Sequence, residues 1–458
     1  MFLDFLKYKD SDKVAVICGD EKITYRKLYE KVLFYSKAFE CDFHAVIVYG
    51  TTLNSLISII SLLFAKRTYI PVGVCTPLDR LNEIIKSTKA NLIVSDVEIP
   101  GVDIEVRSLS EIECKKNIKR VKNNKTAYII STSGTTGKPK LIPISYDNLH
   151  NFITWISNIS VLKPYKNISV LNTSDFSFDL SVASIYYSLC NGHCLVLNSF
   201  SFCQDSFFQT FKDEINLIVA TPTFIKLCLL DKDFNKSNFK SLRCIYFCGE
   251  ALDSMIVKKL FERFSDISII NAYGPTEATC SVCASVITDS SDIPAGDINS
   301  SCVSIKIINN EIVLKGKSVF DGYIRKKSKK VYKENNVNCF RTGDLGYIKD
   351  NKLYVKDRLD RQIKYKGYRI ELSDIEKNIS DIEGVLSCSV IAKKNERGYV
   401  KTIKAFVEAS CFINEEYIKS KLKEKICGYM IPNTIEIVKE LPINKNGKID
   451  RKALENYD

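Results

Sequence analysis

The sequence predicts a mixed α/β protein with a large amino-terminal domain of layered α/β subdomains, a small barrel-like β subdomain and a small α+β carboxyl-terminal domain. Three observations predict this class. Short apolar, β-branched segments alternate with helical patterns through the first three quarters of the chain, which is typical of α/β layers with largely parallel sheets. From about residue 301 closely spaced strands replace that alternation. Near Asp360 a second change leads into a compact α+β pattern.

Six segments of the first part are predicted to be buried strands, because each is short, apolar and rich in β-branched residues. They are residues 44–50, 91–96, 127–134, 169–174, 217–222 and 244–250. Helical patterns lie between them, and the predicted helices are residues 53–65, 146–157 and 253–264. This alternation predicts largely parallel sheets.

The last third of the chain divides into two parts. Residues 304–309 and 311–316 predict neighbouring strands of an antiparallel, barrel-like subdomain. After Asp360 the pattern predicts a strand pair, a helix beginning at Ser373-Asp374, further strands, a helix near 415–426 and a last strand. An Asp in the first turn suits the helix dipole. We therefore predict a large domain over 1–359 and a small one over 360–458, joined by a tight hinge.

Composition supports a folded protein with at least two cores. The 458 residues are 45% hydrophobic and 10% aromatic, with 19 Gly and 11 Pro, which excludes disordered, collagen-like and repeat-array chains. The net charge is +12, from 66 basic and 54 acidic residues, and the excess is spread as single lysines. We interpret it as a coding bias and predict no nucleic-acid partner. A basic surface would still suit an anionic nucleotide and an acidic protein partner.

Cysteine usage predicts a reduced, cytoplasmic protein. The chain has 17 Cys, but it begins without a signal peptide and shows no disulfide-framework spacing. Cys280 and Cys283 form a lone CxxC pair, and without a second ligand pair we reject a zinc site. The most apolar stretch, residues 56–65, is only 10 residues long, so we predict no membrane insertion.

The most informative segment is ISTSGTTGKPKL, residues 130–141. A buried strand runs into a loop of glycines and hydroxyl residues that ends with Lys138 and Lys140. Such a loop turns backbone N–H groups and hydroxyl donors toward one centre and so can wrap a polyphosphate. It lacks the spacing of the Walker loop. The alternative is a flexible surface turn.

Three later segments supply complementary chemistry. NAYGPTEAT (271–279) offers Tyr273 for stacking on a purine and Glu277 for metal–phosphate ligation. RTGD (341–344) offers Asp344 to chelate two ribose hydroxyls, and the chain ends with a Gly-flanked lysine, Lys448. Each segment alone could be an ordinary loop. Their order and joint occurrence indicate a nucleotide site.

With ITYRKL (23–28) and FAKRTYIPV (64–72), these motifs give a resemblance over nearly the whole chain. The chain resembles the adenylate-forming superfamily, and within it the adenylation domains of nonribosomal peptide synthesis and the D-alanine–D-alanyl carrier protein ligases. FSFDLSV (176–182) and YFCGEAL (246–252) are most similar to the D-alanyl ligase branch.

The resemblance implies a two-step reaction with ATP and Mg²⁺ as cofactors. A carboxylate attacks the α-phosphate to give an acyl-adenylate and pyrophosphate, and the phosphopantetheine thiol of a carrier protein then displaces AMP. The chain ends four residues after Leu454, so a separate carrier is expected to act in trans. The small domain is expected to be mobile and to rotate about Asp360, withdrawing Lys448 and bringing the loop at 366–368 to the site.

The resemblance also implies a role for each motif residue. Phosphates are assigned to Thr132, Ser133, Gly134, Thr135, Thr136, Gly137 and Lys140, the adenosine moiety to Asn271, Tyr273, Gly274 and Thr276, and ribose to Asp344 and Arg358. Lys448, Glu277 and Thr136 are the catalytic candidates. Glu277 would bind Mg²⁺, and Lys448 would bridge the substrate carboxylate and the ATP oxygens. Catalysis would be alignment and charge neutralisation, without a protein nucleophile.

The substrate class depends on Asp179. A carboxylate beside an apolar pocket is costly unless it meets a cation, and in the family it pairs with the α-ammonium of an amino acid. The alternative is a cap of the helix 180–189. The family resemblance implies which residues line the side-chain pocket. They are Leu180, Ala183, Val219, Tyr246, Cys248, Ala272, Cys280 and Ser281. No full charge occurs there, so we predict a small or medium uncharged amino acid, D-alanine being one candidate. Tyr246 either fills space or offers its hydroxyl.

The sequence departs from the family pattern in two places, and two alternative functions stay open. Asp357 stands where the family has Gly before Arg358, and the region 280–316 is shorter than usual. An acyl- or aryl-CoA synthetase is the main alternative, although Asp179 would then lack an ammonium. A non-catalytic nucleotide-binding regulator is the other, although Lys448 and Glu277 are retained. The stereochemistry of the substrate, the carrier and the oligomeric state stay undetermined.

Overall fold

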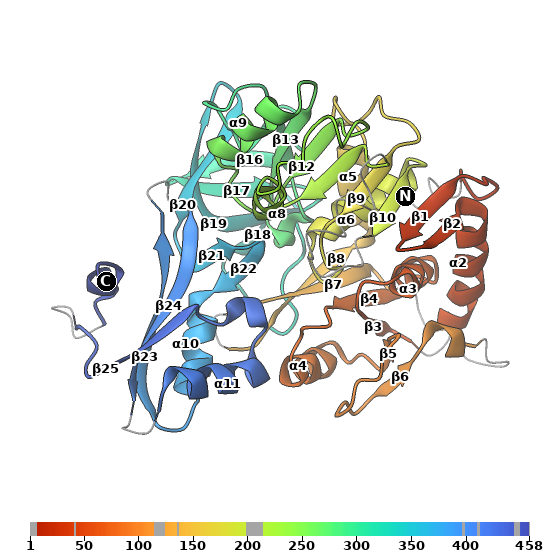
Figure 1. Ribbon diagram of the computed structural model, residues 1–458. Coiled ribbons are helices and arrows are strands. Elements are labelled where there is room, and N and C mark those ends of the chain that lie inside the picture. The colour runs from red at the N-terminus through yellow and green to blue at the C-terminus, as the bar shows by residue number, and fades with distance from the viewer. Residues whose placement is uncertain are drawn as a thin grey trace. The chain divides into compact units, whose positions relative to one another are not determined.

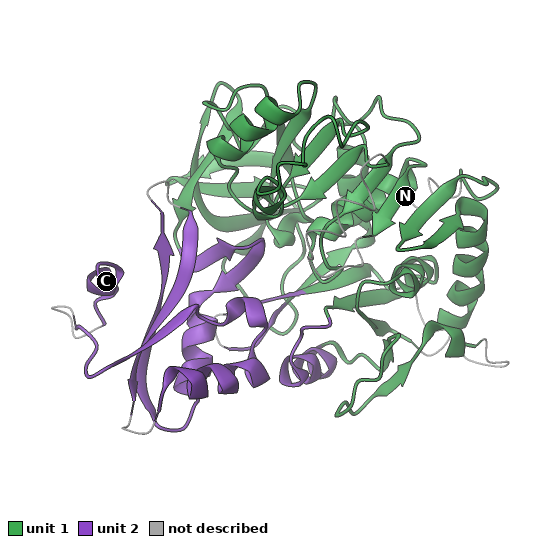
Figure 2. Ribbon diagram, in the orientation of Figure 1, with its two compact units in different colours: residues 1–73, 88–130, 141–359 green, residues 74–87, 131–140, 360–458 purple. Residues whose placement is uncertain are grey.

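The computed structural model describes residues 7–40, 43–113, 124–134, 137–197, 214–395, 399–409, 413–443 and 449–457. The chain forms two compact units, which Figure 2 colours separately. Unit 1 comprises residues 1–73, 88–130 and 141–359, and unit 2 comprises residues 74–87, 131–140 and 360–458. Two amino-terminal segments therefore group with the carboxyl-terminal part. The division into domains 1–359 and 360–458 stays a prediction.

An eight-stranded sheet of unit 1 carries three of the six strands predicted for the first part of the chain, namely 169–174, 217–222 and 244–250. Its order is β14-β13-β12-β11-β9-β10-β1-β2. The bounds are β1 (Val14–Cys18), β2 (Glu21–Thr24), β9 (Ser169–Asn172), β10 (Cys194–Leu197), β11 (Leu217–Ala220), β12 (Cys244–Phe247), β13 (Ser268–Tyr273) and β14 (Cys283–Ile287). The inner strands pair in parallel, and only the two edge pairs are antiparallel. The predicted α/β class is confirmed.

A second sheet of unit 1 has six strands in the order β6-β5-β3-β4-β7-β8. The bounds are β3 (Ala45–Tyr49), β4 (Thr68–Val72), β5 (Leu92–Val94), β6 (Glu105–Arg107), β7 (Thr126–Thr132) and β8 (Lys140–Ser145). The predicted strand 127–134 thus ends at Thr132, because glycine and hydroxyl residues follow it. The segment after β7 is the one for which the sequence predicts phosphate binding, and it is called the phosphate loop below.

The helices of unit 1 begin where the sequence supplies capping side chains. The bounds are α2 (Tyr25–Phe39), α3 (Leu53–Phe64), α5 (Tyr146–Ile156), α6 (Leu180–Cys190), α8 (Pro222–Cys228) and α9 (Ser254–Arg263). Thr52 and Ser145 accept hydrogen bonds from the backbone at the start of α3 and α5, which satisfies otherwise unpaired N–H groups. Helix α6 lies between the two sheets (Figure 1): it packs on β9 and β10, and its Tyr186 hydroxyl lies 2.9 Å from that of Tyr69 in β4.

The third sheet of unit 1 is antiparallel, with the order β15-β20-β19-β17-β16 and β18 beside β19. The bounds are β15 (Gly296–Asp297), β16 (Ser304–Ile308), β17 (Glu311–Lys315), β18 (Val331–Glu334), β19 (Val337–Lys349) and β20 (Lys352–Arg358). Asn309 and Asn310 both have positive φ between β16 and β17. A tight two-residue turn of this kind requires that geometry, and Asn tolerates it better than most residues. The two strands predicted from 304 and 311 are confirmed.

Unit 2 has its own core. It contains α4 (Leu78–Thr88), a hairpin of β21 (Gln362–Tyr365) and β22 (Tyr368–Glu371), α10 (Leu372–Ser380), α11 (Glu415–Lys425), α12 (Arg451–Glu455) and a sheet of β23 (Val385–Lys394), β24 (Val400–Ala409) and β25 (Thr434–Val438). Helix α10 packs against β23, and its Ile375 and Ile379 belong to the buried core of this unit. The predicted strand pair and both predicted helices are present.

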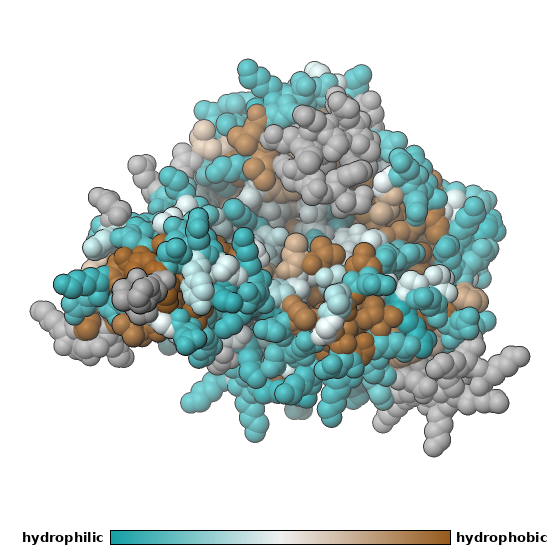
Figure 3. Space-filling view, turned by 60° about the horizontal axis from the view of Figure 1, so that its bottom comes forward, coloured by the Kyte–Doolittle hydropathy of each residue, from teal (hydrophilic) through white to brown (hydrophobic). Residues whose placement is uncertain are grey.

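The sequence predicts that the cysteines are reduced, and that stays a prediction. Every cysteine that the structure describes is free. Among the described residues, no helix is long and apolar enough to cross a membrane. The face drawn in Figure 3 is mainly hydrophilic, with hydrophobic residues gathered in separate patches.

Candidate active site

Three predicted nucleotide residues form one hydrogen-bonded chain in unit 1. Tyr273, at the end of β13, donates from its hydroxyl to Asp344 Oδ2 over 2.6 Å. The other carboxylate oxygen of Asp344 accepts from Arg358, which also donates to the carbonyl of Thr342. Asp344 and Arg358 face each other across β19 and β20. Burial, and then the Asp344 charge, raises the pKa of the Tyr273 phenol well above its usual value, so the phenol stays a neutral donor.

Asn271 does not join this chain. Its amide donates to the Pro294 carbonyl over 2.8 Å, which ties β13 to the loop before β15. Gly274 has a structural reason to be glycine, because a Cβ there would lie 2.5 Å from the Cα of Ser281. The adenosine motif is thus packed tightly against the turn that follows it.

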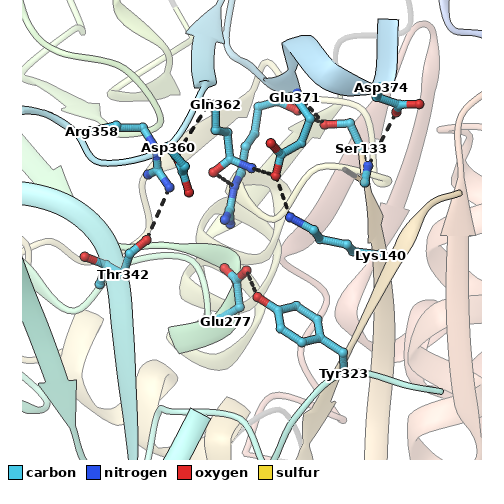
Figure 4. A network of polar contacts seen from close by, with 12 residues as sticks. Ser133, Lys140, Glu277, Tyr323, Thr342, Arg358, Asp360, Gln362, Glu371 and Asp374 are labelled. Carbon is cyan, nitrogen blue, oxygen red and sulfur yellow. Dashed lines mark hydrogen bonds and ion pairs between the residues drawn. The ribbon is translucent and has the colours of Figure 1, made fainter. Parts of the chain in front are cut away.

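Glu277 lies in a short 3-10 helix, Thr276–Ala278, and is completely buried. Its Oε1 accepts from the Tyr323 hydroxyl over 2.7 Å, and Figure 4 shows the two side chains pointing at each other. Sequence reasoning missed Tyr323, because a tyrosine in a loop after Asp321-Gly322 carries no signal of its own.

The chemistry of Glu277 would fit a ligand of a magnesium ion. A buried carboxylate such as that of Glu277 is the hard oxygen ligand that Mg²⁺ prefers. Among the described residues no group of three or more His, Cys, Asp or Glu side chains could hold a metal ion. Mg²⁺ at nucleotide sites characteristically takes one or two carboxylates and completes its shell with phosphates and water.

The phosphate loop belongs to unit 2, where the segment 369–374 holds it. Ser133 Oγ donates to the Arg369 carbonyl and accepts from the Glu371 backbone N–H, both over 2.9 Å. The backbone N–H of Gly134 donates to Asp374 Oδ2 over 3.4 Å. Lys140 pairs with the Glu371 carboxylate, as Figure 4 shows. Two predicted phosphate ligands, Gly134 and Lys140, therefore already bind carboxylate oxygens.

The remaining residues predicted to bind phosphate are Thr132, Thr135, Thr136 and Gly137. The Thr132 hydroxyl is buried and has no hydrogen-bond partner among the described residues. Gly137 has φ +77, a conformation that favours glycine. Thr135 and Thr136 lie outside the described residues.

A buried ion pair supports the phosphate loop from α4. Arg80 Nη2 lies 2.7 Å from Asp374 Oδ2, and both side chains are buried. Burial raises the pKa of Asp374 above its usual value, although the Arg80 charge acts in the opposite direction. Arg80 thus compensates a carboxylate that also accepts from the loop.

Asp179 stands immediately before α6 and makes no capping hydrogen bond from its side chain. The helix-cap alternative is therefore not what the structure has. The other predicted pocket residues come from α6, from the carboxyl ends of β11, β12 and β13, and from the turn at 280–281 that follows the 3-10 helix. The uncharged ones in this core are Leu180, Ala183, Val219, Tyr246, Cys248, Ala272 and Cys280. We call these seven residues, with Asp179 and Ser281, the pocket cluster.

Contacts within the pocket cluster join β12 to the turn after the 3-10 helix. The Tyr246 hydroxyl and Ser281 Oγ lie 2.8 Å apart. The Cys248 thiol approaches the Cys280 carbonyl at 4.0 Å. A hydrogen bond with Cys248 and burial raise the pKa of the Cys280 thiol well above its usual value, so this thiol stays neutral.

Lys448 lies outside the described residues. Ile443 and Ile449, on either side of its segment, pair in an isolated antiparallel bridge. Asp360 is the first residue of the carboxyl-terminal part of unit 2, and its carboxylate accepts from the Gln362 backbone over 3.4 Å. Its role as a hinge stays a prediction.

Two family models match the chain. The model described as AMP-binding enzyme matches residues 6–324, and the model described as AMP-binding enzyme C-terminal domain matches residues 374–448. The chain belongs to the AMP-binding enzyme family. The resemblance that the sequence motifs carry is therefore confirmed, as is the expectation that the chain is an enzyme of this class.

Among curated proteins, the chain is similar to D-alanine–D-alanyl carrier protein ligases. D-alanine–D-alanyl carrier protein ligase of Bacillus licheniformis is 35% identical, and the match covers 97% of this chain and 96% of that protein. The ligase of the same name from Lactococcus lactis is 31% identical with the same coverage of both chains. This AMP-binding enzyme thus matches those ligases along nearly their whole length.

Solved structures show the same fold at lower identity. A Vibrio cholerae adenylation domain in complex with glycyl-adenosine-5'-phosphate has a TM-score of 0.84 at 23% identity, covering 99% of this chain and 96% of that one. A nonribosomal peptide synthetase protein containing adenylation and PCP domains gives 0.84 at 21% identity, covering 99% and 83%. An o-succinylbenzoate CoA synthetase from Bacillus subtilis gives 0.83 at 18% identity, covering 99% and 98%.

Proposed function

We propose that this AMP-binding enzyme activates a small or medium uncharged amino acid, with D-alanine as the first candidate, and transfers it to the phosphopantetheine thiol of a separate carrier protein. The observation that carries this proposal is the match to D-alanine–D-alanyl carrier protein ligases over 97% of the chain. The arrangement of the pocket cluster supports it independently.

Asp179 supports an amino acid over a simple carboxylic acid. Its side chain does not cap α6, and the pocket cluster beside it carries no other full charge. A carboxylate in such surroundings gains most from a cation. The α-ammonium of an amino acid supplies that cation, whereas an aliphatic or aryl acid has none.

The phosphate loop has the chemistry to hold the anionic part of ATP. Gly134 N–H and the Lys140 ammonium bind carboxylate oxygens of the protein itself, so the same donors suit phosphate oxygens. The unpartnered Thr132 hydroxyl adds a further donor. We assign Thr132, Ser133, Gly134, Thr135, Thr136, Gly137 and Lys140 to the phosphates.

The chain of Tyr273, Asp344 and Arg358 supports the adenosine end. The Tyr273 ring is fixed at its hydroxyl by Asp344, which leaves its apolar body to stack on adenine. Carboxylate oxygens each accept more than one hydrogen bond, so Asp344 retains capacity for ribose hydroxyls. Asn271, Gly274 and Thr276 complete the assignment of this motif.

Glu277 is assigned to Mg²⁺, which when bound neutralises phosphate charge and so eases the approach of a second anion. In the first step a carboxylate oxygen of the amino acid bonds to the α-phosphorus while the bond to the bridging oxygen breaks, and pyrophosphate leaves. Lys448 would bridge the two anions and offset their repulsion, as the family resemblance implies. In the second step the carrier thiolate bonds to the acyl carbon and AMP leaves with the electron pair.

We also propose that the enzyme acts in the cytoplasm and that its acceptor is a separate carrier protein. An acceptor in trans, the hinge at Asp360 and rotation of the small domain follow from the family resemblance. The main alternative, an acyl- or aryl-CoA synthetase, shares the fold of the o-succinylbenzoate CoA synthetase. It predicts pyrophosphate exchange with unsubstituted acids and CoA as acceptor.

Asp179 gives the test. Amino-acid-dependent ATP–pyrophosphate exchange is measured over the proteinogenic amino acids, their D-forms and propionate, for the full chain and for Asp179→Ala. We expect the best amino acid to lose at least about 10-fold in kcat/KM on losing an ion pair. Asp253→Ala is the matched control, because Asp253 caps α9 through the Met255 backbone N–H. An unchanged profile in Asp179→Ala, with propionate as good as alanine, would instead support the acid–CoA ligase.

A further inference from the structure

The positive charge of the chain is concentrated in one segment of unit 1. Residues 315–333 include eight basic residues and one acidic residue. This segment therefore contributes +7 of the net charge of +12, and the excess is not spread evenly along the chain. We call its cations the basic surface, and they are Lys315, Lys317, Arg325, Lys326, Lys327, Lys329, Lys330 and Lys333.

The fold brings the two ends of this segment together. Strands β17 and β18 pair with the same part of β19, because Lys315 and Tyr332 are both in register with Cys339. Neighbouring strands lie about 4.8 Å apart. The cations of β17, of β18 and of the loop that connects them therefore lie in one region of unit 1.

Little negative charge opposes the basic surface. Asp321 lies 3.7 Å from Lys333, and Glu334 lies 3.1 Å from Lys315. Both carboxylates are exposed to solvent, so these pairs are weak. Four cations of the loop are exposed as well, namely Arg325, Lys326, Lys327 and Lys329.

The loop begins beside the proposed magnesium ligand. Tyr323 donates to Glu277, as Figure 4 shows. The backbone N–H of the next residue, Ile324, donates over 3.1 Å to the carbonyl of Leu141 in β8, the strand that follows the phosphate loop. The cations start at the following residue, Arg325. Two contacts thus hold the start of the loop at the proposed nucleotide site.

The other end of the loop is fixed to a second nucleotide motif. The carbonyl of Lys330 accepts from the backbone N–H of Arg341 over 2.8 Å. Arg341 opens the motif that supplies Asp344, the proposed ribose ligand. Between these ends, Tyr323 and Lys326 pair in an isolated antiparallel bridge that closes a turn. The loop therefore presents its cations in a defined conformation along the edge of the proposed site.

We propose that the basic surface is the docking site for an acidic face of the carrier protein. This inference rests on the proposed function and adds to it the surface that the acceptor protein uses. The second step requires a protein to bring its thiol to the acyl-adenylate, so a docking surface fixed to Glu277 and to the strand of Asp344 is suitably placed. Opposite charges on two proteins speed their encounter and select the correct partner.

Two other anionic partners fit this surface less well. The phosphates of ATP already have proposed ligands in the phosphate loop, and cations on two strands and a connecting loop extend beyond one triphosphate. Stable attachment to an anionic membrane needs apolar insertion besides basic residues. Within residues 315–338, all of which the structure describes, Val337 is the only exposed large hydrophobic residue, and it is only 36% exposed.

The test compares two acceptors in the second step. Transfer of the activated amino acid is measured with the phosphopantetheinylated D-alanyl carrier protein of Bacillus licheniformis and with free pantetheine, which has no protein surface. We expect Arg325→Glu/Lys327→Glu/Lys329→Glu to raise the KM for the carrier protein at least about 10-fold at low salt. The difference from wild type should shrink in 1 M salt, where the Debye length is about 3 Å.

The same variant should keep the wild-type KM for pantetheine and wild-type ATP–pyrophosphate exchange, because neither reaction uses the carrier surface. Lys240→Glu/Lys258→Glu/Lys259→Glu is the matched control. It makes the same change in net charge at three exposed residues of unit 1, two of them in α9. The KM for the carrier protein should stay at the wild-type value in this control.

The outcomes separate docking from amino acid activation. An unchanged KM for the carrier protein in the loop variant, with a melting temperature that shows a folded protein, would overturn the docking site and leave activation standing. An equal rise in both triple variants would also overturn it, since net charge and not position would then matter. No exchange with any amino acid would overturn the proposed function together with the inference.

Two further results would assign the basic surface to another partner and so overturn the inference. One is a KM for ATP in the exchange reaction that rises as much as the KM for the carrier protein. The other is sedimentation of the wild type with vesicles of phosphatidylglycerol and phosphatidylcholine that the loop variant loses, while its KM for the carrier protein is unchanged.

Discussion

Tyr323 donates its phenolic hydrogen to Glu277 Oε1 over 2.7 Å, and the carboxylate that accepts it is completely buried. The phenol fixes the orientation of the carboxylate that we propose as a magnesium ligand. Ligands of metal ions are commonly oriented by such outer hydrogen bonds. Tyr323 is therefore a positioning residue for Glu277.

Loss of the Tyr323 hydroxyl should weaken the metal dependence of nucleotide binding. We expect Tyr323→Phe to raise the Mg²⁺ concentration for half-maximal ATP binding about 10- to 100-fold, the effect typical of losing a hydrogen bond that orients a metal ligand. Calorimetric titration of ATP at several Mg²⁺ concentrations measures this. Tyr347→Phe, at an exposed position of β19, is the control. Equal Mg²⁺ dependence in wild type and Tyr323→Phe would contradict the positioning role.

Asp344 should be essential for adenosine binding. We expect Asp344→Asn to weaken AMP binding at least about 10-fold, because it removes charge-assisted bonds from both Arg358 and the ribose. Asp292→Asn provides a close match, since Asp292 likewise accepts from a tyrosine hydroxyl, that of Tyr354, and from a cation, Lys352. If the two variants bind AMP equally well in direct titration, Asp344 is not the ribose ligand.

His193 should make the stability of unit 1 sensitive to mild acid. Burial lowers the pKa of this His from 6.5 to about 4, and its Nδ1 has no hydrogen-bond partner among the described residues. The unfolded chain therefore takes up a proton below pH 6.5 that the folded chain refuses, so the contribution is present above that pH and is lost as pH falls toward 4.

From those two values, unfolding should become easier by about 2 kcal/mol between pH 7.5 and pH 5. Urea unfolding at both pH values measures this difference, and His193→Gln should reduce it by most of that amount. A variant with the same pH dependence as wild type would show that folding does not lower the pKa of His193.

The buried pair of Arg80 and Asp374 should stabilise unit 2. Arg80→Met leaves a buried carboxylate without its cation, which typically costs about 3–5 kcal/mol. The double variant Arg80→Met/Asp374→Asn should recover part of that loss. Arg26→Met removes a pair with Asp12 in which both side chains are exposed, and it should cost no more than about 1 kcal/mol. Equal unfolding midpoints for Arg80→Met and Arg26→Met would contradict this account.

The strand–helix alternation predicted the fold class because the inner strands are short, apolar and β-branched on both faces. It named no strand at the inner strands β1, β4, β10 and β13. It also missed two edge strands, β2, whose residues Glu21–Thr24 alternate weakly, and β6, which has three residues, Glu105–Arg107. Edge strands of this kind gain stability from a single neighbour, so their pattern hardly differs from that of a loop. Their existence depends on the sheet that they join.

The site residues, too, could be predicted where a local motif marks them, and their partners could not be predicted where contacts join distant segments. The motif that ends β13 marks Tyr273, and the pairing of β19 with β20 brings Arg358 to Asp344. Nothing local marks Tyr323 as the partner of Glu277, or Glu371 as the partner of Lys140, because each contact joins segments far apart in the chain. The family resemblance implied a role for each motif residue, whereas the hydrogen-bonding partners of these residues are apparent only in the folded structure.

The most direct test of amino acid activation is D-alanine-dependent ATP–pyrophosphate exchange by the full chain, compared with Lys448→Ala and with Lys445→Ala as a control in the same segment. The account predicts incorporation of labelled pyrophosphate into ATP that requires a small amino acid and Mg²⁺. It also predicts a loss of at least about 100-fold in Lys448→Ala, with ATP binding retained and Lys445→Ala active. Undiminished exchange in Lys448→Ala, or exchange driven equally well by propionate, would contradict it.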